Sequence, residues 1–278
     1  MNKQYVKKHY KMRIRILTPT FIGGGQEYII DKTKYIYEPG AGELIILDEA
    51  KWAEFLGKNN KFDSLIRFYS QSQNMGRPQK GAPASLPLLA WLKRENIQKS
   101  EYEKLAAYKA AVEARDKSTM NDVHLFIKNV FMQPYIPGSS IKGAVRTALL
   151  HEAVTRNPSR FRKYWHQLEQ EADIEVPEKM IGAMNRVAKN IENEVFQVDM
   201  KRGPADDALK ALHISDSMPF SSDYLRIMQK TDYHVDPVND NNLKRLPIYR
   251  ECLIPDACSK MSVSIDTEWF EKAGFEGN

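Results

Sequence analysis

Cysteine is nearly absent from this chain, with only Cys252 and Cys258 among its 278 residues. The two residues form no CxxC pair and have no neighbouring histidine at metal-ligand spacing, which argues against a disulfide framework and against a zinc site. So little cysteine fits a reducing cytoplasm best. We therefore expect a cytoplasmic protein that needs neither a metal nor a cofactor.

Long apolar runs are also missing. The N-terminal stretch MNKQYVKKHYKMRIRILTPT is basic, but it lacks the uninterrupted apolar segment of a signal peptide. Elsewhere no apolar run is long enough to span a bilayer. We therefore expect no membrane partner.

The excess of one charge is small. There are 41 Lys and Arg against 36 Asp and Glu, which gives a formal net charge of +5 and a pI near 8.9. This balance favours an anionic partner, but many ordinary enzymes share it, so charge alone decides little. With 42% hydrophobic residues, the chain can bury a real core in one or two domains.

Patterns typical of strands lie toward both ends of the chain. Residues 12–17, MRIRIL, alternate between polar and apolar side chains, which places Arg13 and Arg15 on one face of a strand. Further strands are expected in segments rich in β-branched and aromatic residues, namely EYIID, KYIYE, ELIILD, VHLFIKNVFMQPYI, LKALHISDS, LPIYRECLIP and MSVSIDTE.

Helical spacing dominates the middle of the chain. It predicts a largely helical insertion over roughly residues 49–122, with 88–115 read as helical, and polar helices over 157–196. Strands at both ends with helices between them indicate an α+β fold. We expect a modified ferredoxin-like, RRM-like sheet core with large helical insertions.

The most informative stretch is YIPGSSIKGAVRT at residues 135–147. Pro137-Gly138 predicts a tight turn, after which Ser139 or Ser140 is expected to cap a helix. The unpaired amides and the positive dipole end of such a helix favour phosphate.

The same helix places Lys142 and Arg146 on one side, four residues apart. Gly143 lies between them. Glycine within a helix costs about 1 kcal/mol relative to alanine, so its presence indicates that something must come close at a position where a side chain would interfere. These parts suit a site that reads the backbone of a nucleic acid. An ordinary amphipathic helix with solvated Lys and Arg explains the pattern equally well.

A second glycine-rich element, FIGGG at residues 21–25, follows the first expected strand. The backbone amides of Gly23, Gly24 and Gly25 could cradle a phosphate. The element matches neither GxGxxG nor GxxxxGK[ST], and a hairpin turn is the commoner explanation of such a cluster.

The pairing of LTPTFIGGGQEY with YIPGSSIKGAVRTALL resembles the RAMP superfamily of CRISPR proteins. In that family a glycine turn and an IPGSS-[IL]-KG helix flank the bound guide RNA. Two further segments, ALHISDSMPF and LPIYRECLIPDACSKMSVSIDTEWFEKAGF, resemble the terminal subunit of type III-A (Csm-type) effector complexes rather than the repeated backbone subunit. The resemblance spans residues 14–275 and is weakest across the helical insertion.

This resemblance implies a single RRM-like domain of the RAMP fold over residues 1–278. The implied function is a non-catalytic subunit that caps the 3′ end of the crRNA and is needed for its maturation in antiviral and anti-plasmid defence. Implied partners are the 3′ region of the crRNA, target RNA, the adjacent RAMP backbone subunit and recruited host nucleases. The implied RNA-contacting residues are Gly23, Gly24, Gly25, Ser139, Ser140, Lys142 and Arg146.

Members of this subunit family usually extend well beyond the point where this sequence stops, at Gly277-Asn278. The resemblance therefore implies that a C-terminal portion, including a late glycine-rich RNA-contacting loop, is missing. Either the sequence is truncated or this relative is short.

Two residues keep a catalytic alternative open. Related backbone subunits cut target RNA with an aspartate in the loop after the first strand, and Asp31 in EYIIDKTKY lies in a broadly comparable region. An ordinary strand-end carboxylate explains Asp31 better, and His9 in KKHYK fits a solvated terminal side chain. The alternatives are an endoribonuclease acting on crRNA precursor or target RNA, and an RRM-like protein unrelated to CRISPR.

Overall fold

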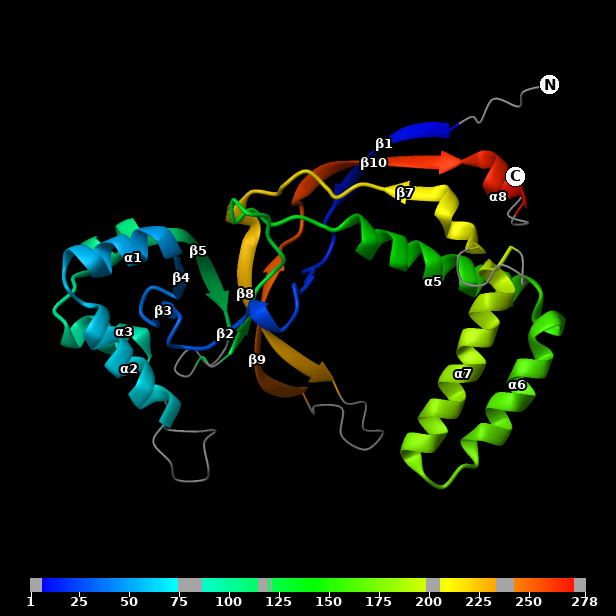
Figure 1. Ribbon diagram of the computed structural model, residues 1–278, viewed down its shortest axis with the longest axis horizontal. Helices are drawn as coiled ribbons and strands as arrows, with labels where there is room; N and C mark the ends of the chain where they lie inside the picture. Colours follow the sequence, from blue (N-terminus) through cyan, green and yellow to red (C-terminus); the bar gives the residue numbers. More distant parts are fainter. Residues whose placement is uncertain are drawn as a thin grey trace. The chain divides into compact units, whose positions relative to one another are not determined.

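The computed structural model describes residues 7–74, 87–114, 120, 122–198, 206–233 and 243–272 (Figure 1). The chain divides into two compact units. The first unit consists of residues 1–13, 136–218 and 260–278, and the second of residues 14–135 and 219–259. Each unit therefore combines segments that lie far apart in the sequence. The expectation of a single domain over residues 1–278 stays a prediction.

A three-stranded sheet has the order β1-β10-β7. It consists of β1 (Lys7–Arg15), β7 (Leu212–Ile214) and β10 (Cys258–Asp266), and the boundary between the two units falls within β1 and β10. β7 and β10 run antiparallel, with Val263 opposite Ile214.

Burial alternates along β1. Met12 and Ile14 are half-buried, whereas Arg13 and Arg15 are exposed. The alternation predicted for residues 12–17 is therefore confirmed, although the strand begins five residues earlier, at Lys7. The N-terminal half of β1 is exposed on both faces, so its sequence lacks the alternation of polar and apolar residues that indicates a strand.

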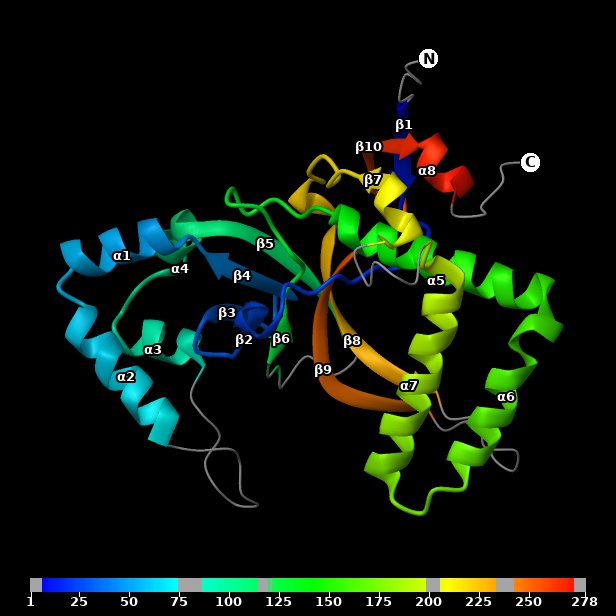
Figure 2. The same cartoon turned by 45° about the vertical axis from the view of Figure 1, so that its right-hand side comes forward.

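Three helices accompany this sheet in the first unit: α5 (Gly138–Arg156), α6 (Pro158–Ala172) and α7 (Pro177–Phe196). The short α8 (Thr267–Lys272) follows β10. α6 and α7 lie side by side (Figure 2) and confirm the helices predicted over 157–196. Two apolar clusters hold the helices together and hold α5 to the sheet. Their buried members are Phe161, Tyr164, Val187 and Ile191 in one, and Phe196, Ala208, Leu209 and Leu212 in the other.

The second unit contains a seven-stranded mixed sheet with the order β2-β6-β9-β8-β5-β4-β3. Two neighbouring pairs, β5–β8 and β6–β9, are parallel, and the others are antiparallel. Its strands are β2 (Ile29–Ile30), β3 (Tyr35–Glu38), β4 (Glu43–Leu47), β5 (Ala106–Glu113), β6 (Val123–His124), β8 (Leu225–Tyr233) and β9 (Leu243–Leu253). The mixed class of fold predicted from the sequence is confirmed.

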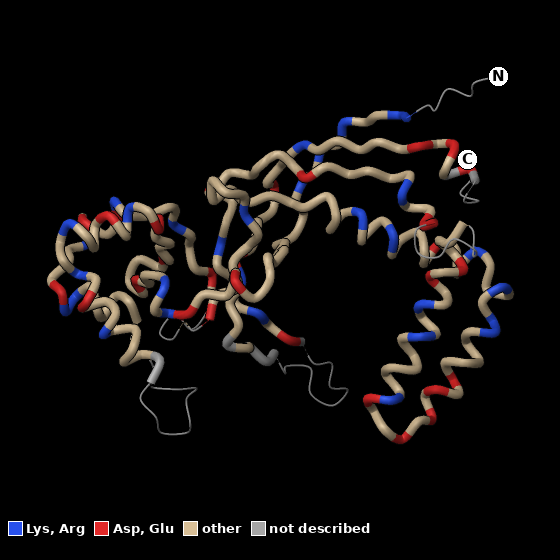
Figure 3. Tube along the Cα trace, in the orientation of Figure 1, with Lys and Arg blue, Asp and Glu red and all other residues tan. Residues whose placement is uncertain are grey.

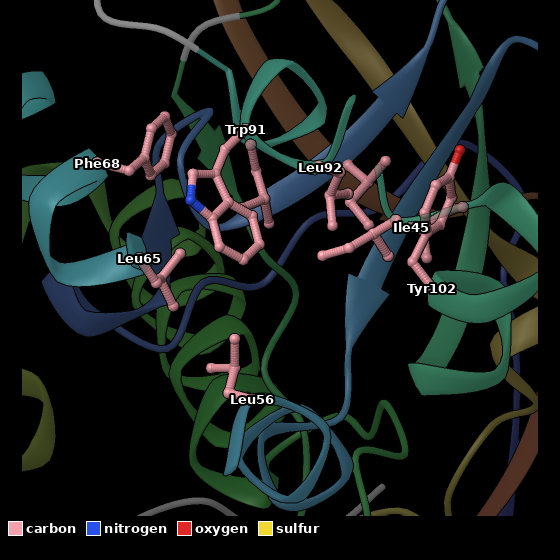
Figure 4. Packing of buried hydrophobic residues seen from close by; sticks show 10 residues of the cluster. Ile45, Leu56, Leu65, Phe68, Trp91, Leu92 and Tyr102 are labelled. Carbon is pink, nitrogen blue, oxygen red and sulfur yellow. The ribbon is translucent and has the colours of Figure 1, made fainter. Parts of the chain in front are cut away.

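Four helices belong to this second unit: α1 (Glu49–Lys58), α2 (Phe62–Asn74), α3 (Leu88–Arg94) and α4 (Lys99–Tyr102). They enclose an apolar core with β3 and β4, in which Trp91 lies next to Phe68 with ring centroids 6.4 Å apart (Figure 4). α1 begins where the Asp48 side chain accepts a hydrogen bond from the Lys51 amide at 3.0 Å. None of the described helices is long and apolar enough to cross a bilayer.

The prediction of helix over 88–115 is wrong for residues 106–113, which form β5 in the interior of the sheet. Alanine is the best helix former, and the segment AAYKAAVE contains four alanines, so local propensity favours a helix. Its burial nevertheless has a period of two, because Tyr108, Ala110 and Val112 are buried and the residues between them are exposed. Tertiary packing overrides the local preference. β8 also lies in the sheet interior, where no strand was predicted.

A buried ion pair joins the centre of this sheet to the segment that follows β6. The side chains of Lys128 and Glu251 are 2% and 0% exposed, and they pair directly. The remaining capacity of the Glu251 carboxylate is filled by the Tyr108 hydroxyl at 2.7 Å and the Phe126 amide at 2.9 Å. Burial lowers the pKa of Lys128 and raises that of Tyr108. Every oxygen of the carboxylate is therefore satisfied.

Replacing Glu251 with alanine should lower the free energy of unfolding by about 3–5 kcal/mol, because it leaves the Lys128 ammonium buried without a counter-charge. Urea unfolding followed by circular dichroism measures the loss. Glu54→Ala, which breaks the exposed pair of Glu54 with Lys58, is the control and should change little. Equal effects of the two substitutions would contradict the central role of Glu251.

A second charged cluster joins α6 to α7. The Glu194 carboxylate pairs with Lys163 at 2.8 Å and accepts hydrogen bonds from the Tyr164 hydroxyl at 2.7 Å and from Arg160 Nε at 2.9 Å. The side chain of Glu194 is only 15% exposed. Lys163, followed by Tyr164, lowers the pKa of Glu194 to about 2.

Because the pKa of Glu194 is lower in the folded protein than in the unfolded chain, its contribution to stability is present above pH ~4.5 and is lost as the pH falls toward about 2. The cationic partners, Arg160 and Lys163, are largely exposed, so we expect a loss of about 1 kcal/mol after solvent screening. Urea unfolding at a series of pH values measures it. Glu194→Gln should flatten the curve in this window, and an unchanged curve would contradict the assignment.

Candidate nucleic-acid interface

The start of α5 is held by the protein's own groups. The Gly138 amide donates a hydrogen bond to Asp216 Oδ1 at 2.8 Å. A Cβ at Gly138 would lie 2.1 Å from the carbonyl oxygen of Ile214. Gly138 is therefore required by the close packing of the helix start against the end of β7.

The prediction that Ser139 or Ser140 caps α5 is wrong. Pro137 occupies the N-cap position and no side chain of the motif makes a capping bond. Pro137 already has an extended conformation that can precede a helix, so both serines fall in the first turn, where their side chains are exposed. Asp216 supplies the acceptor that the sequence motif lacks, from 78 residues away.

The exposed face of α5 is lined with small side chains. It begins at Ser139 and Ser140, and no carboxylate occurs in the helix before Glu152. A Cβ at Gly143 would meet no atom within 4 Å. Lys142 is half-buried and makes no ion pair or hydrogen bond with the described part of the chain. The remaining small residues of this face are Ala144, Thr147 and Ala148.

Arg146 is engaged within the protein. Its guanidinium pairs with Asp207 at 2.6 Å and with Glu192 at 3.6 Å, and it lies 4.1 Å from the ring centroid of Phe196. Its side chain is 30% exposed. Lys142 and Arg146, which the helical spacing treats as equivalent, therefore differ: the first is available to a ligand and the second joins α5 to α7 and to the residues before β7.

The glycine turn lies in the second unit. Thr20 exchanges backbone hydrogen bonds with Leu253, and Gly23 forms an isolated bridge with Phe126. Gly25 has a φ of 105°, a conformation that favours glycine. A Cβ at Gly24 would lie 2.4 Å from the Tyr28 ring. The chain's own geometry thus accounts for Gly24 and Gly25, while Gly23 and Gly25 remain exposed.

Two residues beside this turn were not found from the sequence. Arg250 in β9 places its guanidinium 5.1 Å from the ring centroid of Phe21, and His124 in β6 meets the same ring edge-on at 6.5 Å. Arg250 and His124 are opposite each other in the pairing of β6 with β9. More than a hundred residues separate them along the chain, so only the strand pairing could reveal the cluster.

The residues of the catalytic alternative make ordinary structural contacts. Asp31 Oδ1 accepts hydrogen bonds from the Thr33 amide at 2.7 Å and from the Thr33 hydroxyl at 2.5 Å, as in an Asx turn. His9 is exposed on β1. Among the described residues, no group of three or more His, Cys, Asp or Glu is placed to hold a metal ion.

The same strand β1 forms a basic surface. Lys7, His9, Lys11 and Arg13 occupy alternate positions and are all exposed, so they share one face, and β1 contains no acidic residue (Figure 3). Thus the predicted RNA-contacting residues fall into two groups. Ser139, Ser140, Lys142 and Arg146 lie in the first unit, and Gly23, Gly24 and Gly25 in the second.

A mixed α/β chain with a glycine turn and an IPGSSIKG stretch at the start of a helix fits one known class of proteins. A sequence profile of the RAMP superfamily matches residues 13–277, so the chain belongs to that superfamily. It is similar to the CRISPR system Cms protein Csm5 of Streptococcus thermophilus, with 26% identity over 268 residues, covering 93% of this chain and 64% of that protein. The Csm5 of Mycobacterium tuberculosis (strain CDC 1551 / Oshkosh) is also 26% identical, over 293 residues, covering 96% of this chain and 69% of that protein.

Solved structures agree with this fold. The crystal structure of T. onnurineus Csm5 superimposes with a TM-score of 0.63 at 20% identity, covering 93% of this chain and 69% of that one. A chain in the cryo-EM structure of a Csm-crRNA-target RNA ternary complex of a type III-A CRISPR-Cas system gives the same TM-score and identity, covering 93% of this chain and 64% of that one. The chain thus spans about two thirds of the length of these relatives.

Two glycine-to-alanine substitutions in α5 should have opposite effects on stability. Gly138→Ala should lower the free energy of unfolding by about 1–3 kcal/mol, because its methyl group collides with backbone. Gly143→Ala should raise it by about 0.5–1 kcal/mol, since an exposed helix interior favours alanine. Urea unfolding of both variants checks this, and a destabilised Gly143→Ala would mean that Gly143 has an intramolecular role.

Proposed function

We propose that this protein is a non-catalytic, crRNA-binding subunit of a type III-A CRISPR Csm complex. It caps the 3′ end of the crRNA and supports crRNA maturation in antiviral and anti-plasmid defence. The observation that carries the proposal is the exposed face of α5, where Gly143 brings an intrinsic cost to the helix without any packing reason, next to the unpaired Lys142.

The chemistry of this face suits a phosphate backbone rather than base edges. Small side chains let another backbone come close, and Ser139 and Ser140 offer hydroxyl donors in the first turn of the helix. The absence of carboxylates before Glu152 avoids repulsion of phosphates. Recognition of this kind depends on salt and is nearly independent of base sequence. The basic face of β1 adds to the attraction for RNA.

The relatives support the partners that we propose. The matched Csm5 proteins and the ternary complex with crRNA and target RNA support both RNAs and an adjacent RAMP backbone subunit as partners. Maturation of the crRNA end is proposed to proceed through recruited host nucleases. The hydrogen bonds that hold Asp31 in a turn support a non-catalytic role. We also propose that β1, β10, β7 and α5 form a ferredoxin-like core. The proposed location of the protein is the cytoplasm.

Single substitutions of Lys142 and Arg146 should separate binding from stability. Lys142→Ala should weaken the binding of single-stranded RNA and reduce the slope of log K against log salt by about 0.7, the value for one phosphate contact. Arg146→Ala should mainly lower the free energy of unfolding, by about 1–3 kcal/mol, through loss of its bond to Asp207 and its ion pair with Glu192. Fluorescence anisotropy at several salt concentrations and urea unfolding measure the two effects.

Gly143→Ala is the sharpest variant in the same assay, because it keeps every charge. It should weaken RNA binding several-fold while the protein becomes more stable. Lys179→Ala, at an exposed lysine of α7 with no ion pair to the described residues, is the charge-matched control for Lys142→Ala. Wild-type affinity in both Lys142→Ala and Gly143→Ala would refute this face as an RNA site.

A further inference from the structure

Arg250 is a cation without a counter-charge. Its Nε atom is buried and has no hydrogen-bond partner, and no carboxylate of the described chain forms an ion pair with it. Arginine stays charged in proteins, and charges removed from water are normally paired or hydrogen-bonded. The guanidinium contacts the ring of Phe21, and this cation–π contact leaves its donors unused.

Three other cations of the second unit have partners within the protein. Lys128 pairs with the fully buried Glu251, and Arg15 pairs with Asp256 at 2.6 Å. Arg226, on the neighbouring strand β8, donates to the carbonyl oxygens of Asp223 at 2.7 Å and Leu225 at 2.8 Å, and lies 3.8 Å from Glu113. Arg250 therefore differs from these three cations, which the fold satisfies.

The Phe21 ring connects Arg250 to the glycine turn. A Cβ at Gly23 would lie 3.0 Å from the tip of that ring, so the same ring lies against the turn and against the guanidinium. His124 borders the same ring. Through this ring, the exposed backbone of Gly23 lies near a planar cation with free donors. A fork of N–H donors beside glycine amides matches the geometry of a phosphate.

We infer that Arg250 binds a phosphate group. Its guanidinium is held in place by the Phe21 ring, and the phosphate belongs to an RNA strand that lies across residues 23–25. The inference rests on the proposed function in one respect, namely that the phosphate belongs to RNA; free phosphate shares the same chemistry. Phe21 acts as a positioning residue. The binding of the anion supplies the counter-charge that the protein itself lacks.

The test compares Arg250→Met with Arg226→Met in the full chain. Both remove one arginine charge from the same sheet. Arg250→Met should weaken the binding of a mixed-sequence single-stranded RNA by about tenfold and reduce the salt slope by about 0.7, without lowering the unfolding midpoint. Arg226→Met should lower the unfolding midpoint, because its carbonyl partners lose their donor, and should keep the wild-type salt slope.

Phe21→Leu should reproduce part of the affinity loss of Arg250→Met, and the double variant should lose no more than Arg250→Met alone. An unchanged affinity in Arg250→Met, or equal losses in Arg250→Met and Arg226→Met, would overturn the inference. If wild type fails to bind RNA but inorganic phosphate raises its unfolding midpoint and not that of Arg250→Met, the anion site stands and the proposed RNA function falls. Failure of wild type in both assays overturns both.

Discussion

The buried carboxylate of Glu251 organises the second unit. It joins β9 to β5 through Tyr108 and to the segment after β6 through Phe126 and Lys128. A charge with so little exposure is tolerated only when each of its oxygens is satisfied, so these elements must meet in one arrangement. Side chains alternate along a strand, and Arg250, the preceding residue, therefore points to the other face of the sheet. There it has no such set of partners. Two adjacent residues of β9 thus differ: the fold satisfies the charge of Glu251, whereas the charge of Arg250 has no partner among the described residues.

Glycine residues give the same contrast in α5. Gly138 lies where any side chain would strike the backbone of Ile214, and its amide is bound by Asp216. Nothing in the chain lies near the missing side chain of Gly143. Both belong to one short motif, and a motif alone does not say which residue serves folding. The atoms around each glycine show which one serves folding, because a glycine required by the fold has a contact that a side chain would disrupt. For Gly143 no such contact is present, and the reason that we propose for its cost is an external partner.

Local patterns predicted the features that depend on near neighbours. The alternation in β1 and the helices over 157–196 were readable because their period repeats along the chain. Features that depend on distant residues were missed. β5 is rich in alanine and is a strand only because neighbouring strands flank it. Arg146 looked like a ligand because Asp207 lies 61 residues away, and Arg250 gave no signal because Phe21 is far from it in sequence.

The modest net charge of +5 says little about where an anion would bind, because the fold neutralises some of the cations near the motifs and not others. Arg146, Lys128 and Arg15 each have a carboxylate partner. Lys142, Arg250 and the lysines of β1 differ from these residues, because none of them has a carboxylate partner among the described residues. A phosphate that reaches an unpaired cation gains its attraction without breaking an internal bond, whereas one that reaches Arg146 must compete with Asp207 at 2.6 Å. Affinity for RNA should therefore follow the distribution of unpaired cations rather than the number of basic residues.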